Sequence, residues 1–164
     1  MTAPSDVTIR QAVADDAVAI AHLHLDVWED AYAGVMPVSV FERRRATIAE
    51  RIERWRRQLT DSPTRTTVAE DSSGLVGFAN VGPPRADDVS VDEELRALYV
   101  RASWWGTGVG HALLTSALTG RAAYLWVLRG NDRAINFYRK HGFVDDGATR
   151  SDEYGTEVRM VRRE

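Results

Sequence analysis

One stretch decides the fold of this chain: residues 94–114 read ELRALYVRASWWGTGVGHALL. Its first seven residues are rich in side chains that favour a β-strand. Three glycines follow at alternate positions, Gly106, Gly108 and Gly110, and an apolar helical pattern begins with them. A strand, a glycine-rich turn and a helix in this order build an anion site, because unpaired backbone amides and the helix dipole converge where the helix starts.

The spacing of these glycines narrows the choice of ligand. Gly-x-Gly-x-Gly is not the Gly-x-Gly-x-x-Gly of dinucleotide-binding folds, and no acidic residue follows at the distance that those folds need. No Gly-Lys-Ser or Gly-Lys-Thr is present, which excludes a Walker loop. Taken alone, the run has two interpretations: a phosphate-binding turn, or a tight turn whose glycines serve packing only.

Hydrophobic periodicity in the rest of the chain predicts further strands and helices. Strands are expected at residues 7–10, 66–70, 75–80, 94–101, 124–128, 143–148 and 157–161, and helices over residues 18–32, 41–59, 109–118 and 132–141. Residues 71–74 read as the turn of a hairpin, and Gly142 ends the last helix. This order predicts a single domain, residues 1–164, with an α/β sheet in one layer and helices on its faces.

Composition excludes several classes of function. Of the 164 residues, 44% are hydrophobic and 27% are charged, as in an ordinary soluble domain. The chain contains no cysteine, which excludes disulfides, thiolate metal sites and a cysteine nucleophile. We find no signal peptide and no apolar stretch that could span a bilayer, and we expect a cytoplasmic protein without a membrane partner.

Charge gives little reason to expect a nucleic-acid partner. The net charge is −3, too small to indicate a polyanionic ligand. Seven arginines gather in residues 43–57, which leaves nucleic-acid binding as an alternative, but Glu42, Glu50 and Glu53 lie among them and favour an ordinary charged helix face. His22, His24 and His111 have no carboxylate at metal-ligand spacing, so we expect no metal, and His111 is expected to be exposed.

Residues 94–114 resemble the central motif of the GNAT superfamily of acetyl-coenzyme A-dependent N-acetyltransferases, and residues 131–143, NDRAINFYRKHGF, resemble its second motif. The order of elements matches over nearly the whole chain. The resemblance implies the GNAT fold of a small bacterial, single-domain member: a central, mixed, mostly antiparallel and twisted sheet of about seven strands, flanked by about four helices.

The same resemblance implies acetyl-coenzyme A as the cofactor. By position in the motif, the pyrophosphate would be bound by the amides of Gly106, Thr107, Gly108, Val109 and Gly110. The pantetheine arm would hydrogen-bond to the backbone of Leu98, Tyr99 and Val100, and Asn131 and Tyr138 would contact it from across a cleft between two parted strands. Trp105 departs from the family, which has Arg or Gln there, so a side-chain contact is lost while the amides remain.

The family reaction is direct transfer of the acetyl group to a primary amine in a ternary complex. Tyr138 is the candidate acid, because its unperturbed pKa of about 10 keeps the hydroxyl protonated at neutral pH. Glu94 is the candidate base, through a water, and strict alternation puts it on one face with Arg96, Leu98 and Val100. Each has a structural alternative: Tyr138 as an apolar-face residue, and Glu94 as part of a solvated acidic strand end.

The acceptor side is expected along residues 28–37, where the resemblance places the wall of the acceptor site. A cationic small-molecule amine could be bound by the ring faces of Trp28 and Tyr32 and by the charge of Glu29. A core role for both aromatic residues is equally compatible with the sequence. A polyamine, an amino acid, an aminoglycoside-like drug or a protein N-terminus all remain open. Antibiotic or xenobiotic modification and a non-catalytic acyl-coenzyme A sensor are the alternative functions, and a homodimer is possible.

Overall fold

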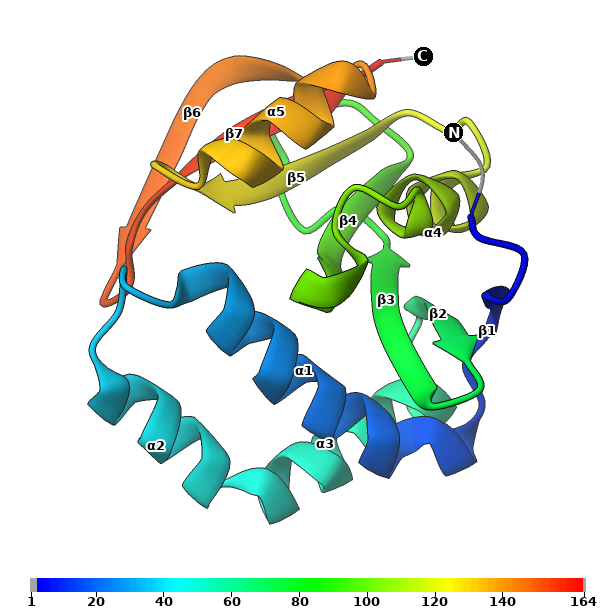
Figure 1. Ribbon diagram of the computed structural model, residues 1–164. Coiled ribbons are helices and arrows are strands. Elements are labelled where there is room, and N and C mark those ends of the chain that lie inside the picture. Colours follow the sequence, from blue (N-terminus) through cyan, green and yellow to red (C-terminus); the bar gives the residue numbers. More distant parts are fainter. Residues whose placement is uncertain (1–2, 164) are drawn as a thin grey trace.

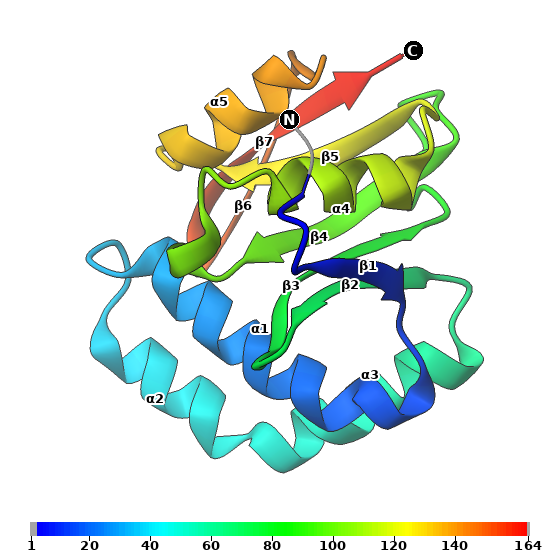
Figure 2. The same ribbon diagram turned by 45° about the vertical axis from the view of Figure 1, so that its right-hand side comes forward.

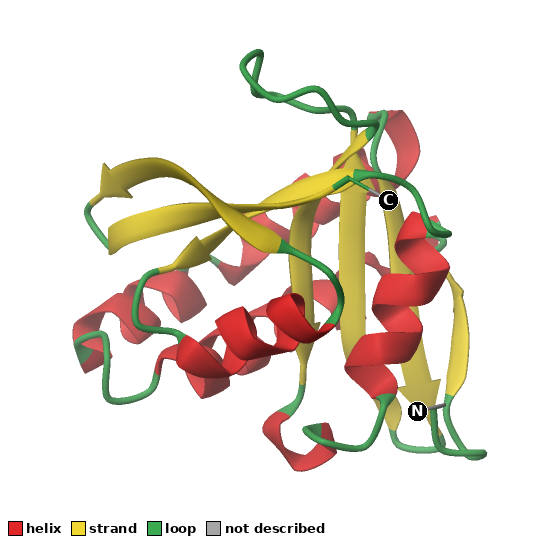
Figure 3. Cartoon of the chain, turned by 90° about the horizontal axis from the view of Figure 1, so that it is seen from above, coloured by secondary structure: helices red, strands yellow, loops and turns green. Residues whose placement is uncertain are grey.

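Seven strands form one mixed sheet in the computed structural model, which describes residues 3–163 (Figure 1). The strands are β1 (Thr8–Gln11), β2 (Arg65–Asp71), β3 (Gly74–Gly82), β4 (Glu93–Val100), β5 (Ala123–Leu128), β6 (Val144–Asp152) and β7 (Gly155–Arg162). They lie in the order β1-β2-β3-β4-β5-β7-β6, and only β4 and β5 run parallel. Seen from above, the long β6–β7 hairpin reaches away from the other strands (Figure 3).

Five α-helices flank the sheet: α1 (Ala17–Tyr32), α2 (Val38–Ala46), α3 (Ile48–Asp61), α4 (Val109–Leu118) and α5 (Asp132–Lys140). Figure 2 separates them into α1, α2 and α3 on one side and α4 and α5 on the other. Short 3₁₀ turns, η1 (Ala14–Asp16) and η2 (Ala102–Trp104), precede α1 and follow β4. No helix among the described residues is long and apolar enough to cross a membrane.

Each face of the sheet has its own apolar core, because the strands place successive side chains on opposite faces. On the α4 and α5 face the core includes Leu113, Leu118 and Phe143, each fully buried. On the α1 and α3 face it includes Ile20 and Phe78. We call these the cofactor face and the α1 face. The fold agrees with the α/β class, the mixed sheet and its seven strands as expected from the sequence.

A β-bulge in β4 corrects the expected alternation of its side chains. Val81 of β3 pairs with Leu95, whereas Asn80 pairs with Ala97, so Arg96 is an extra residue. Leu95 and Leu98 therefore pack on the cofactor face, and Ala97 and Tyr99 pack on the α1 face. Glu94, next to Leu95 in the strand, lies on the α1 face and not with Leu98 and Val100, so that prediction was wrong.

The single helix expected over residues 41–59 is two helices, α2 and α3, which explains five helices in place of about four. Thr47 separates them, and its hydroxyl donates to the carbonyl of Arg44 at 3.0 Å. The Arg51 Nε donates to the same carbonyl at 3.1 Å. These side chains satisfy a carbonyl at the end of α2, so the chain can turn there without leaving its polar groups unpaired.

Candidate functional site

A cleft opens where β4 and β5 part. The two strands pair only through Glu93, Glu94 and Leu95 with Ala123, Tyr124 and Leu125. Beyond these pairs the strands diverge, as Figure 1 shows, and leave a cavity of about 470 Å³ that reaches from α4 and α5 to α1. That volume suits a small-molecule or cofactor site. Among the predicted site residues, those that line it are Tyr32, Leu98, Tyr99, Val100, Trp105, Gly106, Gly108, Gly110, Asn131 and Tyr138.

The turn before α4 presents a row of unused donors. Gly106 and Gly108 adopt φ of 74° and 97°, a region that favours glycine. The first backbone bond of α4 runs from Ala112 N–H to the Gly108 carbonyl at 3.0 Å. Within residues 3–163, the amides from Gly106 to His111 donate to no other group. Six free amides at a helix N-terminus, on a turn without side chains in the way, fit a pyrophosphate.

Trp105 lines the cleft beside this turn. Its indole N–H donates to the Val100 carbonyl at 2.8 Å, and the guanidinium of Arg133 lies 3.6 Å from its ring centre. Arg133 lies in the first turn of α5, so the stacked pair joins the turn before α4 to the opposite wall of the cleft. Thr107 and Val109 contribute no side chain to the cleft, since Thr107 Oγ1 donates to the Trp104 carbonyl at 2.6 Å and Val109 is buried in the core.

Three tyrosines meet inside the cleft. Tyr138 of α5 is buried, and its hydroxyl forms no hydrogen bond with another described residue. Burial raises its pKa well above the ordinary value, with a contribution from the nearby Tyr32 hydroxyl. Burial likewise raises the pKa of Tyr99, whose hydroxyl interacts with Tyr32. Burial also raises the pKa of Tyr32, so all three hydroxyls stay protonated and can donate at neutral pH. Asn131 caps α5 by accepting from the Ala134 amide.

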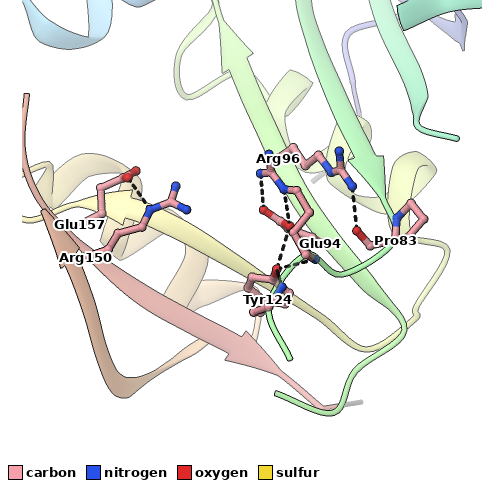
Figure 4. Close-up of polar contacts among 8 residues, drawn as sticks. Pro83, Glu94, Arg96, Tyr124, Arg150 and Glu157 are labelled. Carbon is pink, nitrogen blue, oxygen red and sulfur yellow. Dashed lines mark hydrogen bonds and ion pairs between the residues drawn. The ribbon is translucent and has the colours of Figure 1, made fainter. Parts of the chain in front are cut away.

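Glu94 lies outside the cleft wall, at the point where β4 and β5 begin to part. Its carboxylate accepts from Arg85 Nε at 2.9 Å and from the Tyr124 hydroxyl at 2.7 Å, and the residue is 2% exposed (Figure 4). Burial alone would raise its pKa, but the hydrogen bonds from Arg85 and Tyr124 outweigh burial and hold the pKa below the ordinary value. The carboxylate is thus ionised and already has two partners.

Two of the three residues proposed for the acceptor face are not part of the cleft. Tyr32 lines it, and Trp28 packs edge-on against Tyr32 with ring centres 4.8 Å apart. Glu29 points away and accepts two hydrogen bonds from Arg45, at 2.7 and 2.9 Å. Its charge is therefore committed to Arg45 and is not free for a cationic acceptor.

Two other contacts at the cleft could not be predicted from the sequence. His111 of α4 is half-buried, which corrects the expectation of an exposed side chain, and its Nδ1 lies 2.8 Å from His141 Nε2. Arg133 stacks on Trp105, although the two residues are 28 positions apart in the sequence. Both contacts join α5 to the region around α4, and only the folded chain brings them together.

Comparison with known proteins agrees with this geometry. Residues 62–145 match the family model described as an acetyltransferase (GNAT) domain. An uncharacterised N-acetyltransferase of Bacillus subtilis is 30% identical over 142 residues, which is 82% of this chain and 79% of the relative. A probable N-acetyltransferase of Mycobacterium tuberculosis is 28% identical over 151 residues, 89% of this chain and 84% of the relative.

The fold has a close counterpart among solved structures. The PaiA N-acetyltransferase of Thermoplasma acidophilum, solved in complex with coenzyme A, superposes with a TM-score of 0.75. The superposition covers 96% of this chain and 99% of that one, at 22% identity. Together with the family model and the relative from Bacillus subtilis, the parted strands and the glycine-rich turn place the chain: it belongs to the GNAT family of acetyltransferases.

Proposed function

We propose that this protein transfers the acetyl group of acetyl-coenzyme A to a primary amine of a small molecule, by direct transfer in a ternary complex. One observation carries the proposal: the free amides before α4 open into the same cleft as the unpaired hydroxyl of Tyr138. An anion site and a proton donor that line one cavity suit a phosphorylated thioester. The coenzyme A in the PaiA complex supports the same choice of cofactor.

Several groups of the chain fit this cofactor. The amides of residues 106–110 would hold the pyrophosphate, and the β4 edge from Leu98 to Val100, which has no partner strand on the β5 side, would pair with the pantetheine arm. Asn131 lines the facing wall. Acetyl-coenzyme A, when bound, supplies an activated thioester. Trp105 already binds the Val100 carbonyl, so the arm would share or displace that contact.

Tyr138 is our proposed acid. Its hydroxyl is protonated, unpaired and within the cleft, so it can donate a proton towards the departing sulfur. Desolvation keeps the donor neutral until negative charge develops beside it. No covalent enzyme intermediate is required, because the amine and the thioester would be held together in one cleft.

Glu94 is our proposed base, acting through a water. The bulge at Arg96 places Glu94 on the α1 face, one residue before the last pair of β4 with β5, and its lowered pKa keeps it ionised at neutral pH. Both Arg85 and Tyr124 already bind the carboxylate, so a proton from the amine has to reach it through the Tyr124 hydroxyl or an intervening water. Glu93 points to the other face and pairs with Arg65 and Arg121, each at 2.8 Å.

Release of coenzyme A thiol against a panel of amines tests the proposal. The protein has no cysteine, so a thiol reagent reports only the product. We expect Tyr138→Phe to lower kcat by about 100-fold or more, with acetyl-coenzyme A binding retained. Glu94→Gln should lower kcat at neutral pH, whereas the matched Glu93→Gln should change stability but not kcat. If both Tyr138→Phe and Glu94→Gln retain the full rate, these catalytic assignments are wrong. If the protein binds acetyl-coenzyme A but releases no thiol with any amine, it is a non-catalytic acyl-coenzyme A module.

A further inference from the structure

Two histidines from different helices form a hydrogen-bonded pair in the wall of the cleft. His111 lies in the first turn of α4 and His141 directly follows α5, and both line the cleft. Nδ1 of His111 lies 2.8 Å from Nε2 of His141. The ring of Phe137 packs against Gly110 of α4, where a Cβ would lie 3.3 Å from it, and against His141, with ring centres 4.3 Å apart. Because Gly110 has no side chain, α4 and α5 can approach closely enough for the two histidines to meet.

The hydrogen bonds of this pair determine which ring nitrogens carry hydrogen. Nδ1 of His141 lies 2.7 Å from the carbonyl oxygen of Phe137, which can only accept, so Nδ1 donates. In a neutral His141 the other nitrogen, Nε2, is therefore an acceptor, and Nδ1 of His111 donates to it. Nε2 of His111 has no hydrogen-bond partner within residues 3–163 and carries no hydrogen while the pair is neutral.

One added proton changes what the pair offers to a ligand. The other three ring nitrogens are engaged in the two hydrogen bonds, so the added proton makes Nε2 of His111 an N–H donor. The neutral pair thus presents an acceptor without charge, and the protonated pair presents a cationic donor. An anion beside Nε2 would bind the protonated pair in preference to the neutral one, because opposite charge stabilises the protonated form.

The charges around the pair are positive. Lys140, the last residue of α5, also lines the cleft, and no Asp or Glu is among the described residues that line it. Burial together with the charges of His141 and Lys140 lowers the pKa of His111 from its ordinary value. The pair is therefore neutral at neutral pH unless an anion lies beside it. A wall of this kind suits a ligand that brings negative charge.

His111 also belongs to the turn that we propose for the pyrophosphate. Its backbone amide is the last of the free amides at the start of α4, and its side chain reaches from there to α5. Coenzyme A carries a pyrophosphate and, on its adenosine, a 3′-phosphate. A cofactor held at this turn therefore brings phosphate groups to the side of the cleft where His111, Lys140 and His141 lie.

We propose that the His111–His141 pair, together with Lys140, binds a phosphate group of coenzyme A, and that the pair takes up a proton when it does so. The contact would be made by Nε2 of His111, the nitrogen that the pair leaves free. The proposal rests on the proposed place of coenzyme A in this cleft and adds that cofactor affinity depends on pH. Affinity should be highest at the acid end of the neutral range and fall as the pH rises, because the protonated pair becomes rarer.

Calorimetric titration with coenzyme A measures this coupling without turnover. Between pH 6.5 and pH 8.0 we expect Kd to rise by about tenfold, the lower end of the range for a hydrogen bond to a charged group. A phosphate monoester takes up its own second proton only near pH ~6, below this window. Titrations at pH 7.5 in buffers of different ionisation enthalpy should show net uptake of protons, up to about one for each cofactor bound.

Substitutions of His111 separate its charge from its packing. His111→Phe keeps an aromatic ring in the pair and should bind coenzyme A about tenfold more weakly at pH 6.5, with no pH dependence. His111→Lys supplies a cation over the whole range and should bind tightly at both pH values without proton uptake. His22→Gln, at an exposed position on α1, is the control and should follow the wild type.

His141 has a readout of its own, because it acts through His111. In His141→Phe, Nδ1 of His111 loses its acceptor, so a neutral His111 can carry its hydrogen on Nε2. The pH dependence of Kd should then weaken, and the affinity at pH 8.0 should be at least that of the wild type. A residue that served only helix packing would change stability and leave the number of protons taken up unchanged.

Dephospho-coenzyme A, which lacks the 3′-phosphate, identifies the group that is bound. Loss of proton uptake with dephospho-coenzyme A assigns the contact to the 3′-phosphate, and unchanged uptake assigns it to the pyrophosphate. Either result supports a phosphate contact of the pair.

Three results would count against these claims, and they can be told apart. Coenzyme A binding that is independent of pH in the wild type, or a pH dependence that His111→Phe retains, would reject this role for the pair. Lost affinity in His111→Phe without rescue by His111→Lys would assign His111 a packing role. Failure of coenzyme A to bind at any pH would instead reject the place of the cofactor and, with it, the proposed function.

Discussion

His24 is a histidine that the fold keeps uncharged. It lies among the rings of Trp55, Phe78 and Tyr99, with ring centres 5.4 to 5.9 Å away. Burial, helped by the arginines of α2 and α3, lowers its pKa from 6.5 to about 3. The unfolded chain therefore binds a proton below pH 6.5 that the native protein does not bind until pH 3. Stability must fall as the pH decreases through this window.

We expect this group alone to make the protein about 2 kcal/mol less stable at pH 5 than at pH 7.5. His24→Phe keeps an aromatic ring in the cluster and removes the titration, so its stability should depend less on pH over the same range. Urea unfolding at both pH values measures the difference. His22→Gln, an exposed position on the same helix, is the control and should follow the wild type. An unchanged pH dependence in His24→Phe would contradict the assignment.

At the scale of single residues, the sequence predicts local roles and misses distant partners. Asn131 caps α5, and a cap of this kind depends on residues only three positions away. The pair His111 and His141 is separated by 30 positions, and Arg44 on Trp28 joins two helices. No periodicity encodes such contacts. The same limit applies to Glu29, whose partner Arg45 lies on another helix.

At the scale of elements, the turn before α4 provides a test that separates binding from stability. Gly108 has φ of 97°, and Gly120, beyond the other end of α4, has φ of 79°. Any residue with a Cβ is strained at both positions, by about 1–2 kcal/mol. Only Gly108 lies in the cleft, and a Cβ there would also stand where the pyrophosphate approaches the backbone.

We expect Gly108→Ala and Gly120→Ala to lose similar amounts of stability, while only Gly108→Ala loses coenzyme A affinity, by at least about tenfold. Gly108→Val should abolish binding. Thermal unfolding compares the stabilities, and calorimetric titration with coenzyme A compares the affinities. Normal binding in Gly108→Val would refute the assignment of this turn to the cofactor.

The elements themselves were predicted well where the signal is local. The strand, turn and helix of residues 94–114 are found as expected, because glycine spacing and apolar periodicity act within one element. The bulge at Arg96 was not foreseen, since it is a mismatch between β4 and β3 that neither strand encodes alone. The break at Thr47 escaped notice because helical periodicity continues across it and the interruption depends on side-chain hydrogen bonds.

At the scale of the whole molecule, the sheet order follows from pairings that the sequence left open. The insertion of β7 between β5 and β6 brings Tyr154 of the connecting turn against Trp28, and so joins the last hairpin to α1. Resemblance to a family predicted the architecture as a whole. It could not predict that Arg45 pairs with Glu29 and so takes up the negative charge expected for a cationic acceptor.

The separation of β4 and β5 leads to a prediction about how a ligand in the cleft affects the stability of the domain. The halves of the sheet are joined directly by three residue pairs between β4 and β5, and the open end is bridged by single contacts such as Arg133 on Trp105 and Trp28 against Tyr154. A ligand that fills the cleft would contact β4 and the turn before α4 on one side and α5 on the other. Binding should therefore connect β4 and β5 beyond their three paired residues and stabilise the whole domain.

Coenzyme A at 100 times its Kd should add about 2.7 kcal/mol of stability, which raises Tm by roughly 5–10 °C for a domain of this size. Hydrogen exchange should slow in the half of β5 beyond Leu125 and in the first turn of α5, because these segments face the cleft without a neighbouring strand on the β4 side. Exchange in β1 and β2, which lie far along the sheet, should change little. Gly108→Val, which is expected not to bind coenzyme A, should show neither response at the same concentration. A ligand-dependent rise in Tm without protection of β5 and α5 would place the cofactor elsewhere, because only an occupant of this cleft ties those two segments to β4.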